Sequence, residues 1–310
     1  MTAVAHPFTM RPWSPRPPNA MCRLFGFRSV IRSQVHHSLL DADNALGVQS
    51  EAHPDGWGVA YYIGGAPHLI KSSATALSDQ LFHRVSGIVA AETVVAHIRN
   101  ATQGEMTPIN AHPFQYGRWI FAHNGNLKDF PQHREALLSR IPPELRRYVL
   151  GTTDSEVLFY LLLGHVAERG DLHDRELPMR ALMDAVEDTV AEVQSIVGPL
   201  NPDDSAPPTE TFLTFVITNE RLLLAHQGGK RLYWSTWKHK CPERDVCPSF
   251  GASCEAATRT GFVNHLVVTS EPLHGQNVWL QMEPGEIVAV DGRMRLHRRG
   301  AGPGVVAAGG

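Results

Sequence analysis

Residues 21–27 read Met-Cys-Arg-Leu-Phe-Gly-Phe, and we expect the folded part of the chain to begin at this run. Its apolar and aromatic residues are typical of a buried β-strand. The first twenty residues differ in kind, because they contain five prolines and no periodic apolar pattern. Proline removes backbone donors, and the uninterrupted apolar core of a secretory signal is missing. We therefore expect residues 1–21 to be a disordered leader or the product of a misassigned start.

Beyond residue 27, short runs rich in β-branched or aromatic residues predict further strands, each bounded by turn signals. The predicted strands cover residues 58–63, 93–99, 118–123, 212–218, 221–226, 265–269, 286–290 and 295–297. Helices are predicted over residues 79–85, 131–139, 154–163 and 177–197. Strands come first, the two longer helices lie in the middle, and strands return. This order disfavours a doubly wound parallel sheet and predicts an α+β arrangement.

The composition limits the class of protein. The chain has 310 residues, of which 43% are hydrophobic, and a formal net charge of −3. We expect no nucleic-acid partner and no membrane-surface partner, because such proteins usually carry a basic excess. Four cysteines in a chain of this length do not make a disulfide scaffold, so we expect reduced thiols and a cytoplasmic location. Residues 22–297 are predicted to form a single domain, followed by a frayed Gly/Ala-rich tail over residues 298–310.

The pair Met21-Cys22 is the first chemical signal. If Met21 is the true start, removal of this methionine leaves Cys22 as residue one, with its side chain beside its own α-amine. The reference pKa of an α-amine is about 7.7–8.0 and that of a thiol about 8.5. A partly neutral amine beside a thiol is a nucleophile with a built-in base. For an isolated Met-Cys pair, however, a buried strand thiol is the commoner outcome.

Five further motifs are each weak when taken alone. Asp55-Gly56-Trp57-Gly58 allows tight turning and a close approach to the backbone. Arg99 at a strand end suits a carboxylate, although a surface salt bridge is the commoner role. Ala122-His123-Asn124-Gly125-Asn126 suits a hairpin turn, but it also offers two donors to one oxyanion. Asn110-Ala111-His112-Pro113 fits a structural histidine, and Thr153-Asp154-Ser155-Glu156 fits a helix cap.

As an ordered set, these motifs resemble those of the class II glutamine amidotransferases, which are N-terminal-nucleophile amidohydrolases. The likeness also includes Ala101-Thr102 and Gly104 and spans residues 21–290. It implies an α+β fold of four αββα layers, with two antiparallel sheets stacked face to face. It also implies a cysteine-dependent amidohydrolase that cleaves glutamine or a γ-glutamyl amide through a γ-glutamyl thioester and needs no cofactor.

The resemblance assigns a role to each matching residue. Cys22 would be the nucleophile, with its freed α-amine as general base. The Asn124 side chain and the Gly125 backbone N–H would form the oxyanion hole. Arg99 would hold the α-carboxylate of the glutamyl group and Asp154 its α-ammonium. The remaining three assignments are Thr102, which would position substrate, and His112 and Trp57, which would line or support the pocket.

The chain departs from the family pattern at Asn100, where an aromatic residue is common, and at Gln103, where histidine is common. Asp55-Gly56-Trp57-Gly58 and Ser270-Glu271-Pro272-Leu273 look closer to a stand-alone subgroup. That subgroup includes γ-glutamyl amidases of ergothioneine synthesis and of glutathione breakdown. The largest departure is the segment ahead of Cys22, because a blocked α-amine should abolish activity.

Three functions stay open, since the chain leaves no room for a fused synthase. The protein hydrolyses a γ-glutamyl amide for its own sake, or it supplies ammonia to a separate synthase subunit, or it is a catalytically silent glutamyl-binding or regulatory module. We favour the first, because none of the main motif residues is missing. A structural zinc at His239, Cys241, Cys247 and Cys254 is a further alternative, although their spacing is not that of common zinc sites. We expect no metal in the catalytic site.

Overall fold

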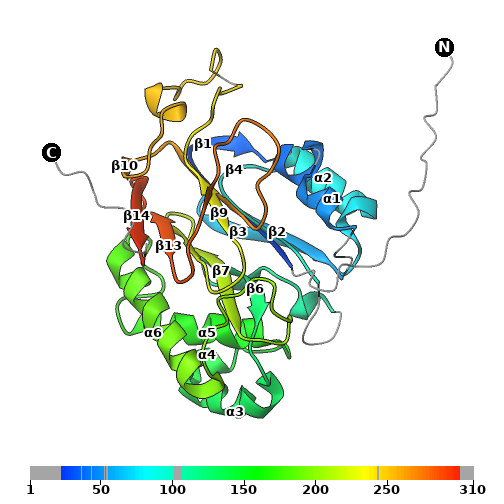
Figure 1. The fold of residues 1–310 in the computed structure, drawn as a ribbon, viewed down its shortest axis with the longest axis vertical. Coiled ribbons are helices and arrows are strands. Elements are labelled where there is room, and N and C mark those ends of the chain that lie inside the picture. The colour runs from blue at the N-terminus through cyan, green and yellow to red at the C-terminus, as the bar shows by residue number, and fades with distance from the viewer. Residues whose placement is uncertain are drawn as a thin grey trace.

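A computed structural model describes residues 22–300, except 36, 43, 52, 54, 101–106 and 243. Two seven-stranded sheets dominate it (Figure 1), and all strand pairings within them are antiparallel. No helix among the described residues is long and apolar enough to cross a membrane.

The first sheet carries the start of the described chain at its centre. Its strands, in spatial order, are β12 (Leu280–Gln281), β9 (Tyr233–Ser235), β11 (His265–Thr269), β1 (Arg23–Gln34), β4 (Ala90–Ile98), β2 (Trp57–Ile63) and β3 (Ala66–Ser72). β1 lies between β11 and β4, so Phe25 pairs with Thr269 on one side and with Ala96 on the other. Cys22 immediately precedes this central strand.

The second sheet carries the Asn124-Gly125 motif. Its strands, in spatial order, are β10 (Gly261–Phe262), β14 (Arg295–Arg299), β13 (Ile287–Val290), β8 (Leu223–His226), β7 (Phe212–Thr218), β6 (Trp119–Asn126) and β5 (Phe114–Tyr116). Within β6, Asn124 pairs with Thr214 and Gly125 with Leu213 of β7.

Helices lie outside both sheets (Figure 1). α1 (Leu46–Gln49) and α2 (Gln80–Ile88) accompany the first sheet. The second sheet is covered by a helical group that contains α3 (Phe130–Arg140), α4 (Pro143–Arg146), α5 (Asp154–Ala167) and α6 (Met179–Val197). Short helical turns occur at His37–Asp41, Ala76–Ser78, Pro108–Asn110 and Ala252–Cys254.

Three hydrophobic cores separate four layers. One core joins α2 to the first sheet and contains Phe82 and Val59. A second lies between the sheets, where Leu24 of the first sheet and Val216 of the second are fully buried. The third joins the second sheet to α5 and α6. The predicted αββα arrangement of two stacked antiparallel sheets is therefore confirmed.

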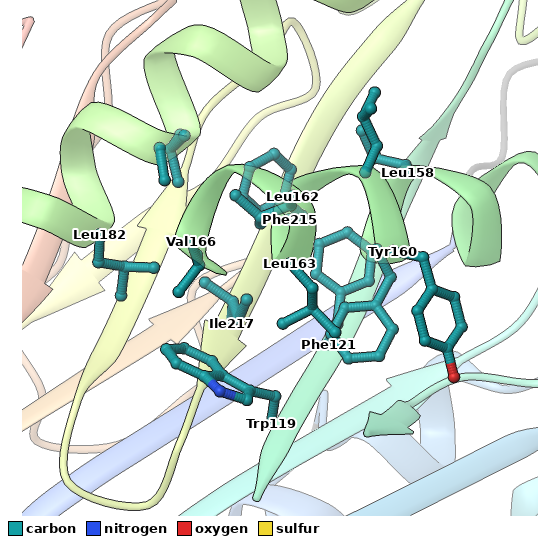
Figure 2. Close-up of a cluster of buried hydrophobic side chains, with 14 of the residues drawn as sticks. Trp119, Phe121, Leu158, Tyr160, Leu162, Leu163, Val166, Leu182, Phe215 and Ile217 are labelled. Carbon is teal, nitrogen blue, oxygen red and sulfur yellow. The ribbon is translucent and has the colours of Figure 1, made fainter. Parts of the chain in front are cut away.

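The third core fixes where α5 begins (Figure 2). The ring of Phe159 on α5 stacks on that of Phe121 on β6, with their centroids 5.3 Å apart. Phe121 also contacts Phe215 of β7 at 5.3 Å. The Thr153 side chain accepts a hydrogen bond from the Glu156 N–H, which is the predicted helix cap. Packing and cap together place the first residue of α5, Asp154, beside the end of β6.

Most predicted elements are present with shifted ends. The predicted strands at 212–218 and 265–269 coincide with β7 and β11. β3 was not predicted, because its sequence Ala-Pro-His-Leu-Ile-Lys-Ser carries a proline and no clean alternation. The tail predicted from residue 298 starts too early, since Arg298 and Arg299 pair with β13. The predicted leader and residues 301–310 lie outside the described residues.

Candidate active site

Cys22 is buried and its sulfur contacts one backbone unit. The thiol donates to the Asn100 carbonyl at 3.3 Å, and the Asn100 N–H donates to the sulfur at 3.2 Å. Burial raises the pKa of the thiol to about 11, against the lowering effect of Asn100, Arg99 and Arg23. In the chain with Met21 still attached, this thiol is therefore protonated at neutral pH. A base must remove its proton before it can attack an amide.

Asn124 and Gly125 occupy consecutive positions near the end of β6. The Asn124 side-chain amide is buried and donates to Ser270 Oγ over a long 3.5 Å. Ser270 is itself fixed, because its Oγ accepts the Leu24 N–H at 2.9 Å. At Gly125 only glycine fits, since an added Cβ would lie 2.1 Å from the Phe212 carbonyl oxygen. This position keeps the backbone open to close approach.

Two opposite charges face the same pocket. Arg99 directly follows β4 and is 3% exposed, and Asp154 begins α5 and is 2% exposed. Asp154 is oriented through both carboxylate oxygens, which accept the Leu127 N–H at 2.8 Å and the Ser155 N–H at 2.7 Å. Burial lowers the pKa of Arg99, while Cys22, Asp55 and Asp154 oppose that shift. A buried cation and a buried anion match the two charges of an α-amino acid head group.

A small pocket unites most of the predicted residues. Its volume is about 20 Å³, and five of the eight predicted residues line it: Cys22, Arg99, His112, Gly125 and Asp154. This volume holds roughly one water molecule, so a glutamyl group requires its walls to move apart. Asn124, next to Gly125, lines a separate and larger cavity of about 520 Å³.

The other two predicted residues are not placed on this pocket. Trp57 is fully buried on the helix side of the first sheet, where its ring meets Phe82 at 5.0 Å and its N–H donates to Asp79. Of the two roles expected for Trp57, lining or supporting the pocket, the first is wrong, because this side chain belongs to the core on the helix side of the sheet and the side chain of a strand residue points to one face only. Thr102 lies outside the described residues.

Three buried histidines support the pocket. His97 Nε2 donates to the His123 carbonyl at 3.1 Å, and the His97 and His112 rings are 4.2 Å apart. His123 Nε2 donates to the Phe212 carbonyl, which can only accept, so Nδ1 accepts from the Ser155 hydroxyl at 2.9 Å. Burial lowers the pKa of all three, that of His97 to about 3. The cluster is therefore neutral at physiological pH.

Buried neutral histidines make the fold acid-sensitive. Burial lowers the pKa of His226, on β8, to about 4, so below pH 6.5 the unfolded chain binds a proton that the folded chain excludes. Each such histidine should lower the unfolding free energy by about 1.4 kcal/mol per pH unit as the pH falls below about 6. Urea titrations from pH 7 to 5 measure this slope. His226→Gln should make it shallower, whereas His173→Gln, at an exposed site, should not change it.

The Asp55-Gly56-Trp57-Gly58 motif acts through its glycines. The Gly56 carbonyl accepts the Arg99 N–H at 2.8 Å, and the φ of +120° at Gly56 favours glycine. At Gly58, an added Cβ would lie 2.1 Å from the His112 carbonyl oxygen and 2.9 Å from Pro113. The motif thus holds Arg99 and His112 in place by close backbone packing.

We expect Gly58→Ala to destabilise the protein by about 1–3 kcal/mol, because β2 and the His112 backbone must move apart. The same shift should displace His112 and lower kcat/KM. Urea unfolding and steady-state kinetics measure the two effects. Gly87→Ala is the matched control, because an added Cβ there meets nothing within 4 Å inside α2 and should stabilise the helix by about 1 kcal/mol. Equal stability of the two variants would contradict the packing argument.

The sequence analysis missed three contributors. Asn100 contacts the thiol through its backbone, so its side-chain identity carries no signal. Ser155 forms hydrogen bonds to both His123 and Asp154, but its place in the sequence indicated only a helix cap. Ser270 lay within the motif Ser270-Glu271-Pro272-Leu273, but pairing with Asn124 requires contact between residues 146 positions apart.

The zinc alternative is not supported. Within the described part of the chain, no group of three or more His, Cys, Asp or Glu residues could hold a metal ion. Cys241, Cys247 and Cys254 are free thiols that line a separate cavity of about 230 Å³. Cys254 accepts a hydrogen bond from the Asn264 side chain instead.

Comparison with known proteins decides the family. The family model described as "Glutamine amidotransferases class-II" matches residues 21–303. The chain belongs to this family. Membership of this family implies amide hydrolysis or transfer.

The curated relatives of this chain differ in how much of their length they share with it. The chain is 28% identical over 219 residues to the probable glutamine amidotransferase DUG3 of Saccharomyces cerevisiae, covering 64% of this chain and 61% of that protein. It is 34% identical over 115 residues to the gamma-glutamyl-hercynylcysteine sulfoxide hydrolase of Mycobacterium tuberculosis, covering 34% and 49%. It is 25% identical to the putative glutamine amidotransferase YafJ of Escherichia coli, covering 86% and 96%. The chain spans 40–61% of the length of the first curated relatives it matches.

Solved structures support the fold. A glutamine aminotransferase class-II domain protein from Silicibacter pomeroyi superimposes with a TM-score of 0.57 at 22% identity, covering 90% of this chain and 98% of that one. The glutamine phosphoribosylpyrophosphate amidotransferase of B. subtilis gives a TM-score of 0.54 at 18% identity, covering 90% and 49%. The chain thus shares the fold of the first structure and of about half of the second.

Proposed function

We propose that the protein hydrolyses glutamine or a γ-glutamyl amide through a γ-glutamyl thioester on Cys22. The convergence of Cys22, Arg99, Asp154 and Gly125 on one pocket carries this proposal. These residues come from a strand start, a strand end, a helix start and a second sheet. A binding module would need the charge pair, but it would have no use for a nucleophile and an oxyanion donor beside it.

The chemistry follows from the positions of these groups. With Cys22 as the first residue, its α-amine removes the thiol proton, directly or through water, and the sulfur attacks the amide carbon. The Asn124 amide and the Gly125 N–H stabilise the negative charge that develops on the carbonyl oxygen. The C–N bond breaks, and the amine leaves with the proton held by the α-amine. Water then attacks the thioester, releases glutamate and restores the thiol.

The head group explains why a γ-glutamyl amide is preferred over other amides. Arg99 would bind the α-carboxylate and Asp154 the α-ammonium of the same group. Both side chains are almost fully buried, so an amide lacking either charge would lose a charge-assisted contact in the pocket. Such a contact contributes about 1.5–3 kcal/mol. The M. tuberculosis relative named as a γ-glutamyl hydrolase supports the same substrate class.

Intact mass and activity test the proposal together. We expect protein purified from its own cells to contain a form that begins at Cys22, and we expect that form to release glutamate from γ-glutamyl amides. Reductive methylation of its α-amine should abolish the activity. If a form beginning at Cys22 hydrolyses no γ-glutamyl amide, or if the full-length chain is equally active, the proposal is wrong.

Location and partners belong to the same proposal. All four cysteines are free thiols, which supports a reducing compartment, and we propose the cytoplasm. We propose a small glutamine or γ-glutamyl amide as the ligand. A separate synthase subunit that receives ammonia is the alternative partner, and co-purification of such a subunit would favour it.

A further inference from the structure

A cavity of about 230 Å³ lies on the helix-side face of the first sheet, and we call it the outer cavity. Its apolar wall includes Phe25 and Phe27 of β1 and Val267 of β11, which belong to the core on that face. The chain between β9 and β10, which projects beside β1 (Figure 1), supplies another wall. Among the described residues, the outer cavity shares no lining residue with the catalytic pocket. It is therefore distinct from the site of the proposed hydrolysis.

The volume of the outer cavity sets the size of molecule that it can hold. A cavity of about 150 Å³ lined by apolar side chains binds benzene. The outer cavity is about 80 Å³ larger, which is roughly the volume of three water molecules in the liquid. It therefore has room for an apolar body the size of a benzene ring together with a short polar end.

Two polar atoms at the outer cavity are buried without a hydrogen-bond partner among the described residues. They are Asn277 Oδ1 and His265 Nε2. Asn277 Oδ1 can only accept a hydrogen bond. Burial, with a smaller contribution from Lys238, lowers the pKa of His265 to about 3, so its ring is neutral and Nε2 can accept or donate. A ligand with a hydrogen-bond donor would satisfy a buried acceptor that the described fold leaves unpaired.

The charge of the outer cavity is one-sided. Lys238 is its one cation among the described residues, and no described carboxylate lines it. Lys238 lies opposite Asn277 in an isolated β-bridge, and its backbone N–H donates to the Cys254 carbonyl at 2.8 Å. Its side chain is half-buried and forms no ion pair with a described carboxylate. An ammonium beside an unpaired acceptor suits a ligand that carries both a carboxylate and a donor.

We propose that the outer cavity binds a small carboxylic acid with an aromatic body and a hydroxyl or amino group next to its carboxylate. The body packs against Phe25 and Phe27, the carboxylate pairs with Lys238, and the hydroxyl or amino group donates to Asn277 Oδ1. Sulfur atoms make favourable contacts with aromatic rings. The thiols that line the cavity and can contact such a body are those of Cys241, Cys247 and Cys254.

Matched ligands test this inference in ligand-observed NMR titrations of the purified protein. 3-Phenyllactate carries all three features, 3-phenyllactamide lacks the charge, and 3-phenylpropionate lacks the donor. We expect 3-phenyllactate to bind with a Kd of about 1 mM or tighter. The amide should bind about 10- to 100-fold more weakly, and 3-phenylpropionate about 3- to 10-fold more weakly. L-Phenylalanine has an ammonium in place of the hydroxyl, so tighter binding of one or the other identifies the donor.

Lys238→Gln tests the cation directly. In this variant the acid and the amide should bind equally, because the charge that distinguishes them has lost its partner. Lys240→Gln is the matched control, since Lys240 is exposed, lies two residues further on and does not line the outer cavity. It should keep the wild-type difference. Circular dichroism should show both variants folded.

Thiol labelling locates the bound ligand. At ten times its Kd, 3-phenyllactate should slow the reaction of iodoacetamide with Cys247, the half-buried thiol of the outer cavity, by about tenfold. The labelling rate of Cys22, which lines the catalytic pocket, should not change.

Four results would overturn the inference. They are no binding of 3-phenyllactate at about 10 mM, equal binding of the acid and the amide by the wild type, an unchanged difference between them in folded Lys238→Gln, and an unchanged labelling rate at Cys247. None of these measurements requires turnover, so the proposed hydrolysis is tested separately.

Discussion

Replacing Cys22 with alanine should reduce turnover of every γ-glutamyl amide by about 10⁴-fold or more, the size of effect seen when a nucleophile is removed. The sulfur is the atom that forms the thioester, and no other cysteine lines the pocket among the described residues. Cys22→Ser should be nearly as inactive, because a hydroxyl is a much weaker nucleophile than a thiol beside the same amine. Glutamate release in a coupled assay, followed for hours, measures both.

Cys254→Ala is the matched control for this experiment. Cys254 is also a buried free thiol, but it lines the separate cavity of about 230 Å³ and bonds to Asn264. The control should keep wild-type kcat, and circular dichroism should show both variants folded. Mass spectrometry of a slow substrate should detect the acyl adduct on wild-type Cys22 and none on Cys22→Ala. Retained turnover in folded Cys22→Ala would exclude the thioester mechanism.

Replacing Arg99 with alanine should lower kcat/KM for γ-glutamyl substrates by about 10²- to 10³-fold, mainly through KM. Truncating one member of a buried charge pair costs about 3–5 kcal/mol, and each 1.4 kcal/mol is a factor of ten. Arg99 is 3% exposed and lines the pocket with Asp154, so its loss would remove the cation proposed to hold the substrate α-carboxylate. Steady-state kinetics on glutamine and on its α-amide isolate this contribution.

Two further variants test whether the loss of activity in Arg99→Ala arises from misfolding. Arg99→Lys keeps the charge but not the planar fork, and it should lose less than Arg99→Ala. Asp154→Asn removes the anion from the other side and should weaken binding of the α-ammonium. In Arg99→Ala, the α-amide of glutamine should bind about as well as glutamine, because the distinguishing cation is gone. If folded Arg99→Ala keeps the wild-type preference for the free α-carboxylate, our assignment of that site is wrong.

The residue pattern alone predicted an α+β arrangement, whereas the four layers and the roles of the site residues came from the family resemblance. Motifs such as His123-Asn124-Gly125 are local, so the identities of adjacent residues are visible before folding. Gly125 illustrates this, because its lack of a side chain is required within 2.1 Å of the Phe212 carbonyl. The amphipathic and apolar periods of α5 and α6 similarly predict helices that pack on a sheet.

The features that could not be predicted from the sequence depend on side-chain orientation and on contacts between residues far apart in the chain. Trp57 follows the motif glycine but points into the helix-side core, and nothing local specifies which face of β2 it takes. Ser270 reaches Asn124 only because β11 and β6 end side by side in stacked sheets. The backbone of Asn100 positions the thiol with no preference for the side chain.

The position of β1 also determines when the site can form during translation. β1 is flanked by β4 and by β11, and Phe25 pairs with Thr269. Contacts between residues so far apart form late and slow folding. A nascent chain on the ribosome therefore cannot complete both edges of β1 until residue 269 has emerged. We expect the Cys22 thiol to stay open to oxidants throughout that interval.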